Sequence, residues 1–390
     1  MGTNLNSYDQ AAEALEVCSG AKVSARRIRR AVKRIADERI EERRQAIAHY
    51  QELSFAEQQA GSQAVEEPPE LAVISMDGGR YQRRDHFGEE ASSGQTHWRE
   101  TKVGCLLSMS SREHPEDPTP EVPDWLLHSE AIRQLAKTGE IPAETEDLPA
   151  EAEEIPAESS AEAEAENPSW EAAKLLEREV LASSVEAEQF GWQLASRAWQ
   201  LGYPRARRLA FVADGANVNW EIQRRHFPQA VPILDLMHAL SYAWAASRAI
   251  KQPAAYERWT RWIWAGEVDR VIAELAEHRA RLGPPPPKAN ENDPRARVDR
   301  AWTYYSNHRQ RMDYPAYRRA GLPLTSSHIE STIKQINRRV KGSEKFWSRD
   351  CGEGVLQLRA DYLSSSQPMH QFWRRHQANQ TGSNAYRQTT

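Results

Sequence analysis

The chain has little cysteine and no long apolar run, and both shortages narrow the classes of protein to which it can belong. Its 390 residues include three cysteines, which lie far apart and form no Cys-x-x-Cys pair. This argues against a disulfide framework and a zinc ribbon. No stretch approaches the roughly 18 consecutive apolar residues of a membrane-spanning helix, and the first residues show no secretory signal pattern. The sequence therefore predicts a cytoplasmic protein that does not enter a membrane.

Negative charge is concentrated in one segment. Between Glu113 and Glu166 there are 17 acidic residues and two basic ones, so the net charge of −5 leaves +10 on the rest of the chain. A basic body suits a protein that binds polyanions, and a solvated surface of mixed charge is the alternative. The segment is rich in Pro, Glu, Ala and Ser, which predicts a surface insertion interrupted by a short helix at 124–137. An acidic DNA mimic that guards a basic site is another interpretation.

The first fifty residues predict two helices and a basic surface. Residues 7–18 show helical spacing, and a second helix begins near Ser24 and has one apolar stripe formed by Ile28, Val32 and Ile35. A short helix, a glycine-containing turn and a basic helix are typical of a helix-turn-helix, although an ordinary packing arm is the alternative. The expected DNA contacts are Arg26, Arg27, Arg29, Arg30, Lys33 and Arg34.

The middle of the chain alternates between strands and helices. Apolar runs that predict strands lie at 71–77, 208–214 and 231–235, and each ends on an aspartate. One or two further strands at 97–109 follow a Gly/Ser-rich turn at 91–95 and suggest an antiparallel meander. Residues 169–201 have the spacing of one long helix, which Gly202 ends. Predicted helices at 217–226 and 236–250 alternate with the later strands, which predicts parallel strands in an α/β layer.

Four acids are candidates for chemistry. Asp77, Asp214 and Asp235 end strands, and Glu330 lies in the first turns of a last long helix that begins near Ser326. Acids beyond the carboxyl ends of parallel strands can converge in one crevice. Phosphodiester cleavage without a covalent intermediate needs an activated water and a stabilised leaving oxygen, which two Mg²⁺ ions about 3.5–4 Å apart provide through oxygen ligands. Capping of the following turns is the alternative role for the aspartates.

Three sequence blocks resemble the catalytic blocks of bacterial insertion-sequence DDE transposases. They are MDGGR (76–80), VADGA (212–216) and SSHIESTIKQINRRVKGSEKFWS (326–348). The third is the most specific, and the residues that fit its family form are Ile329, Glu330, Ser331, Lys334, Arg339, Lys341, Gly342, Ser343 and Trp347. DLMH (235–238) also resembles the Asp/Cys-x-x-His signature of Mutator-like and hAT-like transposases.

The resemblance covers roughly residues 71–376 without the acidic segment, and it implies roles for individual residues. Asp77, Asp214 and Glu330 would be catalytic and would hold two Mg²⁺ ions, for which Mn²⁺ substitutes. Asp235 and His238 would support these ligands or position DNA, and a histidine with a purely structural role is the alternative. Further DNA contacts are expected from Lys334, Arg338, Arg339, Lys341 and Trp347. The alternatives are an exposed basic helix face and, for the tryptophan, core packing.

The resemblance also predicts the architecture. We expect an α/β fold with a ribonuclease H-like mixed sheet flanked by helices, a helical insertion before the catalytic glutamate, and a small all-helical DNA-binding region at the N-terminus. The expected boundaries are 1–55 for the DNA-binding region, 56–70 for a linker, 71–112 and 168–250 for the core, 113–167 for the acidic insertion, 251–322 for the helical insertion, 323–376 for the catalytic helix and a basic C-terminal part, and 377–390 for a disordered tail.

The function that follows is DNA transposition. We expect Mg²⁺-dependent cleavage at transposon ends and strand transfer into target DNA. The expected partners are double-stranded DNA at the nucleoid and further copies of the chain, as a homodimer or higher oligomer on DNA. Two alternatives stay open: a non-mobile metal-dependent nuclease of the same fold, and a catalytically silent transposase-derived DNA-binding regulator. The chain departs from the family in having no paired cysteines in its N-terminal region.

Overall fold

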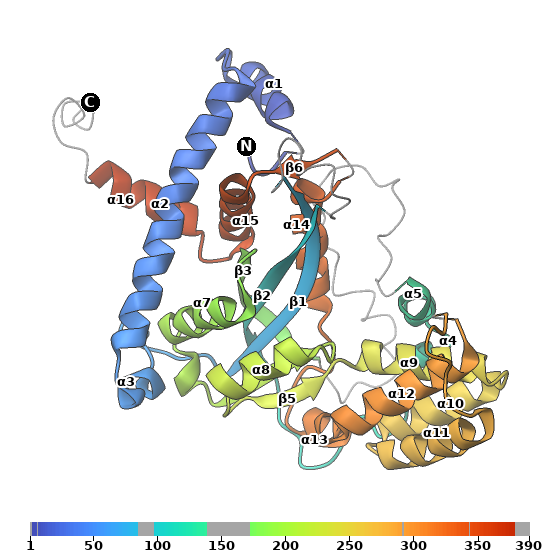
Figure 1. Cartoon of the computed structure of the whole chain (residues 1–390). Helices are drawn as coiled ribbons and strands as arrows, with labels where there is room; N and C mark the ends of the chain where they lie inside the picture. Colours follow the sequence, from blue (N-terminus) through green and yellow to red (C-terminus); the bar gives the residue numbers. More distant parts are fainter. Residues whose placement is uncertain are drawn as a thin grey trace.

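The computed structural model of the chain describes residues 2–5, 7–84, 97–138, 172–290, 292–342 and 344–378. A mixed open sheet lies at its centre and helices flank it (Figure 1). The strands are β1 (Leu71–Arg83), β2 (Trp98–Ser110), β3 (Lys174–Ser183), β4 (Arg208–Ala213), β5 (Val231–Leu234) and β6 (Phe346–Trp347). The fold is therefore α/β, as the sequence predicts.

The sheet joins an antiparallel half to a parallel half. Its strand order is β3-β2-β1-β4-β5, and β6 pairs with the far end of β1. The pairs β1–β2 and β2–β3 are antiparallel, whereas β1–β4 and β4–β5 are parallel. Residues 71–76 and 209–213 are buried throughout, because both faces of the central strands are covered. β1 thus belongs to both halves and runs through the middle of the molecule.

Helices account for most of the remaining described chain. They are α1 (Tyr8–Ser19), α2 (Ala25–Glu52), α3 (Phe55–Ala60), α4 (Asp124–His128), α5 (Glu130–Thr138), α7 (Ala187–Gln200), α8 (Asn217–His226), α9 (Leu236–Ala249), α10 (Pro253–Trp264), α11 (Val268–Leu282), α12 (Pro294–His308), α13 (Tyr314–Arg319), α14 (Ser327–Val340), α15 (Arg349–Leu363) and α16 (Pro368–Ala378). Two short 3-10 turns cover Tyr203–Arg205 and Arg309–Arg311.

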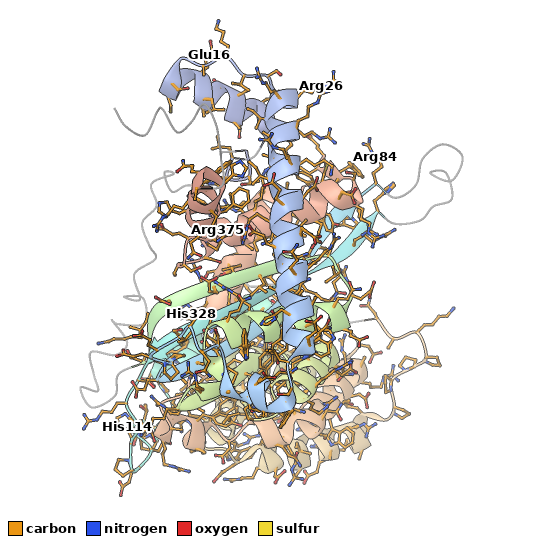
Figure 2. The ribbon with its side chains drawn as sticks, turned by 90° about the vertical axis from the view of Figure 1, so that its left-hand side faces the viewer. Glu16, Arg26, Arg84, His114, His328 and Arg375 are labelled. Carbon is orange, nitrogen blue, oxygen red and sulfur yellow. The ribbon has the colours of Figure 1, made fainter. Side chains whose placement is uncertain are left out.

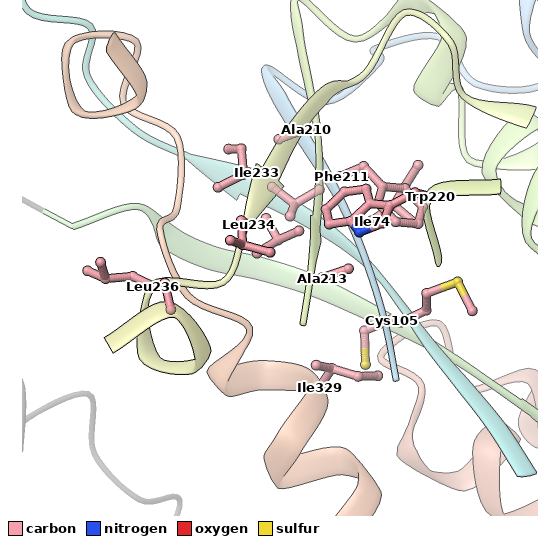
Figure 3. Packing of buried hydrophobic residues seen from close by; sticks show 14 of the residues in the cluster. Ile74, Cys105, Ala210, Phe211, Ala213, Trp220, Ile233, Leu234, Leu236 and Ile329 are labelled. Carbon is pink, nitrogen blue, oxygen red and sulfur yellow. The ribbon is translucent and has the colours of Figure 1, made fainter. Parts of the chain in front are cut away.

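Two of these helices cover opposite faces of β2. A Cβ placed on Gly104 would come within 2.6 Å of Leu194, so α7 packs against the face to which Gly104 points. The thiol of Cys105 lies 3.4 Å from the hydroxyl of Thr332, so α14 covers the other face. Successive strand residues point to opposite faces, which explains why two neighbours contact two different helices. Figure 3 shows Cys105 and Ile329, another residue of α14, in the buried cluster on this side.

The N-terminal helices are integrated into the fold. The second half of α2 packs on α15, where Arg39 binds Asp361 at 2.9 Å and Arg43 binds Glu353 at 2.9 Å. The first half of α2 carries the exposed basic residues, and Figure 2 shows Arg26 near its N-terminal end, beside α1. Of the predicted apolar stripe of α2, Ile28 is buried, and it packs against the N-terminal segment at Gly2. Half of the predicted DNA-binding region is therefore packed into the fold.

Residues 253–319 form four helices that pack on α9 and on one another, so the helices predicted in this segment are present. In the segment before them, the short helix predicted at 124–137 is present as α4 and α5, but this part of the chain is packed into the fold rather than lying on its surface. Residues 113–138, assigned to the acidic insertion, pack against the helical part, with Leu126 and Ile132 completely buried. Asp117 also pairs with Arg318 of α13, whose side chain is fully buried. A few buried leucine and isoleucine side chains hold α4 and α5 against the helical part although the surrounding segment is acidic. The average composition of the segment does not reveal these few apolar positions.

Other predictions need correction. The long helix predicted over 169–201 is wrong in its first half, where β3 pairs with β2 from Lys174 to Ser183. Leu and Glu favour helices locally, but pairing with an existing strand overrides this preference. The one or two strands predicted at 97–109 are a single strand, β2, in agreement with the prediction. The predicted linker contains α3, and α16 extends to Ala378. The turn at 91–95 and residues 139–167, 343 and 379–390 lie outside the described residues.

Candidate active site

Three aspartates form one row across three neighbouring strands. Ser75 of β1 is in register with Val212 of β4, which is in register with Ile233 of β5. Two residues further along the chain stand Asp77, within β1, and Asp214 and Asp235, which directly follow the last residues of β4 and β5. Because side chains alternate with a period of two, all three carboxylates project to one side of the sheet. The row explains why acids separated by 137 and 21 positions in the sequence become neighbours.

The three strands do not all end at these acids. Asp214 and Asp235 follow the last residues of β4 and β5 directly, as predicted. Asp77 instead lies in the middle of β1, which continues to Arg83 because β2 pairs with it as far as Gln82. The prediction that the first strand ends at Asp77 is therefore wrong. Its side chain nevertheless keeps the orientation that the row requires.

Glu330 approaches this row from α14. Cys105, which contacts α14, is the register partner of Ser75, so α14 covers the face of β1 to which Asp77 points. Glu330 lies in the first turn of α14. Within the described residues, the metal-ligating atoms of Asp235, His238 and Glu330 lie within 4.8 Å of one another. The structure thus brings Glu330 to the cluster on the same side of the sheet as Asp77.

This compact group differs from the predicted ligand set, which combines Glu330 with Asp77 and Asp214. The hydrogen bonds of Asp235 show which role it has. One oxygen accepts from the backbone N–H of His238 at 2.8 Å and from its Nδ1 at 3.1 Å. The other accepts from the N–H of Ser326 at 2.5 Å and its hydroxyl at 2.7 Å. Both oxygens of this fully buried carboxylate are therefore saturated, so Asp235 anchors α9 and α14.

His238 is oriented by that anchor. Its Nδ1 is directed at Asp235, so Nε2 is the ring nitrogen that this bond does not use. Burial lowers the pKa of His238, but the hydrogen bond and charge of Asp235, together with Asp214 and Glu330, raise it to about 9. The same hydrogen bonds hold the pKa of Asp235 below its ordinary value although burial opposes this. The Asp235–His238 pair therefore brings a cation close to the carboxylates.

The pKa values of Asp77 and Glu330 are shifted in the opposite direction to that of Asp235. Burial and the neighbouring charge of Asp214 raise the pKa of Asp77 to about 6, against the stabilising N–H of Gly78. Burial, followed by the charges of Asp235 and Asp77, raises the pKa of Glu330 to about 7, although His238 and Lys334 act in the other direction. Crowded, partly dehydrated carboxyls hold their protons, and a divalent cation would reverse this preference.

One oxygen of the Asp214 carboxylate has a structural role. Its Oδ1 accepts from the N–H of Ala216 at 3.0 Å and from Nδ2 of Asn219 at 2.8 Å. The turn-capping role that the sequence left open is thus visible. Both of these bonds use Oδ1. Asp214 therefore combines capping with the capacity to bind a cation.

The donor set fits a divalent metal ion. The carboxylates of Asp77, Asp214 and Glu330 supply the hard oxygen ligands that Mg²⁺ and Mn²⁺ prefer. Three acids and one histidine are close enough for each to influence the protonation of others. The proximity of several carboxylates is unfavourable without a cation, which is the property expected of a metal centre. Chemically, such a centre can activate water and stabilise a leaving oxygen at phosphorus.

The residues predicted to contact DNA are divided by their exposure. The six basic residues of α2 are exposed, as is Arg338, whereas Lys334 and Lys341 are partly buried. Arg339 is 4% exposed, and its guanidinium lies over the rings of Tyr8 and Trp347. Trp347 is buried too, and its indole N–H donates to the oxygen of Val340 at 3.0 Å. The expected DNA contacts of Arg339 and Trp347 are therefore corrected to packing contacts.

Several residues of the site were missed by the sequence interpretation. Asn219 binds Asp214 from the first turn of α8, and a polar residue close after a candidate ligand was an available signal. Ser326 was recognised only as the beginning of a helix, not as a partner of Asp235. Tyr304 donates its hydroxyl to the backbone oxygen of Asp214 at 2.8 Å. No local sequence pattern predicts this last contact, because Tyr304 lies 90 positions from Asp214 in the sequence.

Comparisons with known proteins do not identify a family. No protein-family model matches the chain, and no curated protein is significantly similar to it. Of the helices in the described ranges, none has the length and apolarity to cross a membrane.

Proposed function

We propose that this protein is a DNA transposase of the DDE type with a ribonuclease H-like core. The observation that carries the proposal is the row of Asp77, Asp214 and Asp235 on adjacent strands, with Glu330 brought to the same face by α14. The mixed sheet, in which an antiparallel meander leads into parallel strands, is compatible with such a core. The strand register and the contact of α14 with β2 put residues of the three resembling blocks on one face of the sheet, which supports the proposal.

In this proposal Asp77, Asp214 and Glu330 hold two divalent cations, Mg²⁺ or Mn²⁺. The ions would activate the attacking oxygen and stabilise the leaving one. Asp235 keeps the start of α14 at the end of β5, so that Glu330 points into the cluster. His238, oriented through Nδ1, presents Nε2 to the same space and is suited to donate to a phosphate oxygen.

The reaction has two steps of the same kind. Water first attacks a phosphorus at the element end, the bond to the 3′ oxygen breaks, and that oxygen leaves as a free 3′-OH. This hydroxyl then attacks a phosphorus of target DNA and joins the strands while a target oxygen leaves. Each step is an in-line displacement, so one set of carboxylates serves both. The exposed basic residues of α2 would hold the DNA backbone.

The proposal is tested with supercoiled plasmid that carries the DNA flanking this gene, in the presence of Mg²⁺ or Mn²⁺. We expect nicks with 3′-OH ends and joined products, both lost in Asp77→Ala, Asp214→Ala and Glu330→Ala. Glu257→Ala is a matched control, because Glu257 is an exposed acid on α10 outside the cluster. Nicking without joined products would favour a nuclease, and metal-independent DNA binding without nicking would favour a regulator. Full activity in Glu330→Ala would refute the proposed mechanism.

A further inference from the structure

The turn that follows β4 is in direct contact with α12, a helix that lies about 90 positions later in the sequence. The hydroxyl of Tyr304 donates to the backbone oxygen of Asp214 at 2.8 Å. Gly215 has a φ of +107°, and a Cβ there would lie 2.8 Å from the ring of Tyr304 and 3.2 Å from Nε2 of His308. The backbone turn and α12 are thus in direct contact, with no space for a side chain between them.

Tyr304 is itself held firmly. Its ring is buried and stacks on Tyr242, with centroids 3.9 Å apart and planes at 12°. The ring of His308 meets it edge-on at 4.9 Å. Tyr242 lies on α9 one turn beyond His238. The tyrosine stack therefore links α9, which carries His238, to the turn that carries Asp214.

Asp214 is consequently restrained from two directions. Tyr304 holds its main-chain oxygen, while Ala216 and Asn219 hold Oδ1 of its carboxylate. Together these bonds limit rotation of both the backbone and the side chain. A ligand fixed in place before a cation arrives loses less conformational entropy when it binds, so the cation binds more tightly.

We propose that Tyr304 is a positioning residue for the metal ligand Asp214, so that α12 forms part of the candidate active site. This inference rests on the proposed function, because it takes Asp214 as a ligand. The hydroxyl of Tyr304 contacts the main chain and not the carboxylate oxygens. Its removal leaves the charge and chemistry of the site unchanged and loosens only the placement of one ligand.

The chain offers a matched pair of variants. Tyr304→Phe removes the hydroxyl and keeps the stacked ring. Tyr305→Phe removes the neighbouring hydroxyl, which is also buried and donates to the backbone oxygen of Ala239 on α9 at 2.6 Å. Each variant loses one buried bond to a main-chain oxygen, so their thermal stabilities should fall by similar amounts. Differences in metal affinity then report on position rather than on stability.

Mn²⁺ affinity is measured on the full chain without DNA by electron paramagnetic resonance, and the Mg²⁺ dependence of plasmid nicking is measured in parallel. We expect Tyr304→Phe to weaken Mn²⁺ binding about fivefold, the effect of one hydrogen bond, and Tyr305→Phe to bind as the wild type does. Nicking by Tyr304→Phe should need more Mg²⁺ for half-saturation and approach the wild-type rate at saturation.

The outcomes separate this inference from the function on which it rests. Equal Mn²⁺ affinities of the two variants would overturn the role of Tyr304 while the transposase proposal stands. If Glu330→Ala and Asp214→Ala both bind Mn²⁺ as tightly as the wild type, the metal is not held by these carboxylates, and both proposals fail. A fivefold loss in Tyr304→Phe, rescued by excess metal, supports both.

Discussion

Asp235 and Ser326 join two elements that are 91 positions apart, since one carboxylate oxygen accepts both the N–H and the hydroxyl of the serine. These bonds connect the two ends of the helical part of the chain. The backbone N–H of Leu236 also donates to the backbone oxygen of Leu324 at 3.0 Å there. Glu330 is placed one turn beyond this junction. The junction, rather than α14 alone, therefore determines where the glutamate points.

Asp235→Asn tests the junction. The amide has one oxygen and offers N–H groups toward N–H donors, so we expect the variant to lose about 2–4 kcal/mol of unfolding free energy, because buried donors are left unpaired. Ser326→Ala loses a single hydroxyl bond and should lose about 1 kcal/mol. Urea unfolding measures both. A stable Asp235→Asn protein that no longer binds Mn²⁺ would instead make Asp235 a direct ligand.

The stability of the metal-free protein should fall as the pH rises. The pKa of Glu330 is raised from 4.5 to about 7 in the folded chain, so its contribution is complete below pH 4.5 and is lost as the pH rises through 7. The pKa of His238 is raised from 6.5 to about 9, so its contribution is complete below pH 6.5 and disappears toward pH 9. Both groups act in the same direction.

Glu330→Gln isolates the first of these contributions. Relative to the wild type, the variant should gain unfolding free energy progressively as the pH rises from 4.5 to 7, the interval set by the shift of Glu330. Urea titrations at several pH values without metal provide the measurement. A difference between the two proteins that stays constant over this interval would contradict the raised pKa. Saturating Mg²⁺ should flatten the pH profile of the wild type.

Arg338 and Arg339 are adjacent but should behave in opposite ways. Arg339 is buried against two aromatic rings, so Arg339→Ala should lower the unfolding free energy by about 1–3 kcal/mol. Arg338 is exposed, so Arg338→Ala should leave stability unchanged and reduce the salt dependence of DNA binding by about one counterion. Thermal unfolding and binding titrations at several salt concentrations distinguish them. Equal loss of DNA affinity in both variants would argue against the packing role of Arg339.

The basic surface of α2 can be removed without disturbing its packing. Exchange of four exposed residues for glutamine should weaken DNA binding and flatten its salt dependence by up to about four counterions, since each phosphate contact releases roughly one. The four are Arg26, Arg27, Arg30 and Arg34. Arg39→Gln is the contrasting variant, because it breaks the buried pair with Asp361 and should mainly lower stability. If the variant with all four substitutions binds DNA as the wild type does across a salt titration, α2 is not the DNA contact.

Local signals were sufficient for part of this structure. Asp214 and Asp235 were placed correctly because a short apolar run followed by an acid and a helical pattern marks the end of a strand. The beginning of α14 near Ser326 was predicted from the same kind of signal. These features depend on residues within one or two turns of each other, whereas the choice of Asp77, Asp214 and Glu330 as one site rests on the resemblance of the three sequence blocks.

The remaining features depend on contacts between distant segments. Residues 174–183 have helical spacing, and only the presence of β2 beside them makes them a strand. Arg339 resembles any basic residue on a helix until Gly2 and Tyr8, more than 300 positions earlier, cover it. The contact of Tyr304 with Asp214 likewise has no counterpart in the sequence near either residue. Periodicity contains no information about such pairings.

The continuation of β1 beyond Asp77 has a consequence for motion. Main-chain bonds to β2 flank Asp77 on both sides, and β4 borders the strand up to Ser75. Asp214 and Glu330, by contrast, stand at the junction of a strand with a turn and in the first turn of a helix. Amide hydrogen exchange should therefore be slowest around Asp77 and faster after β4 and at the start of α14. The carboxylates of Asp77 and of the restrained Asp214 would then stay in place, and Glu330 would be the acid that adjusts as a ligand enters.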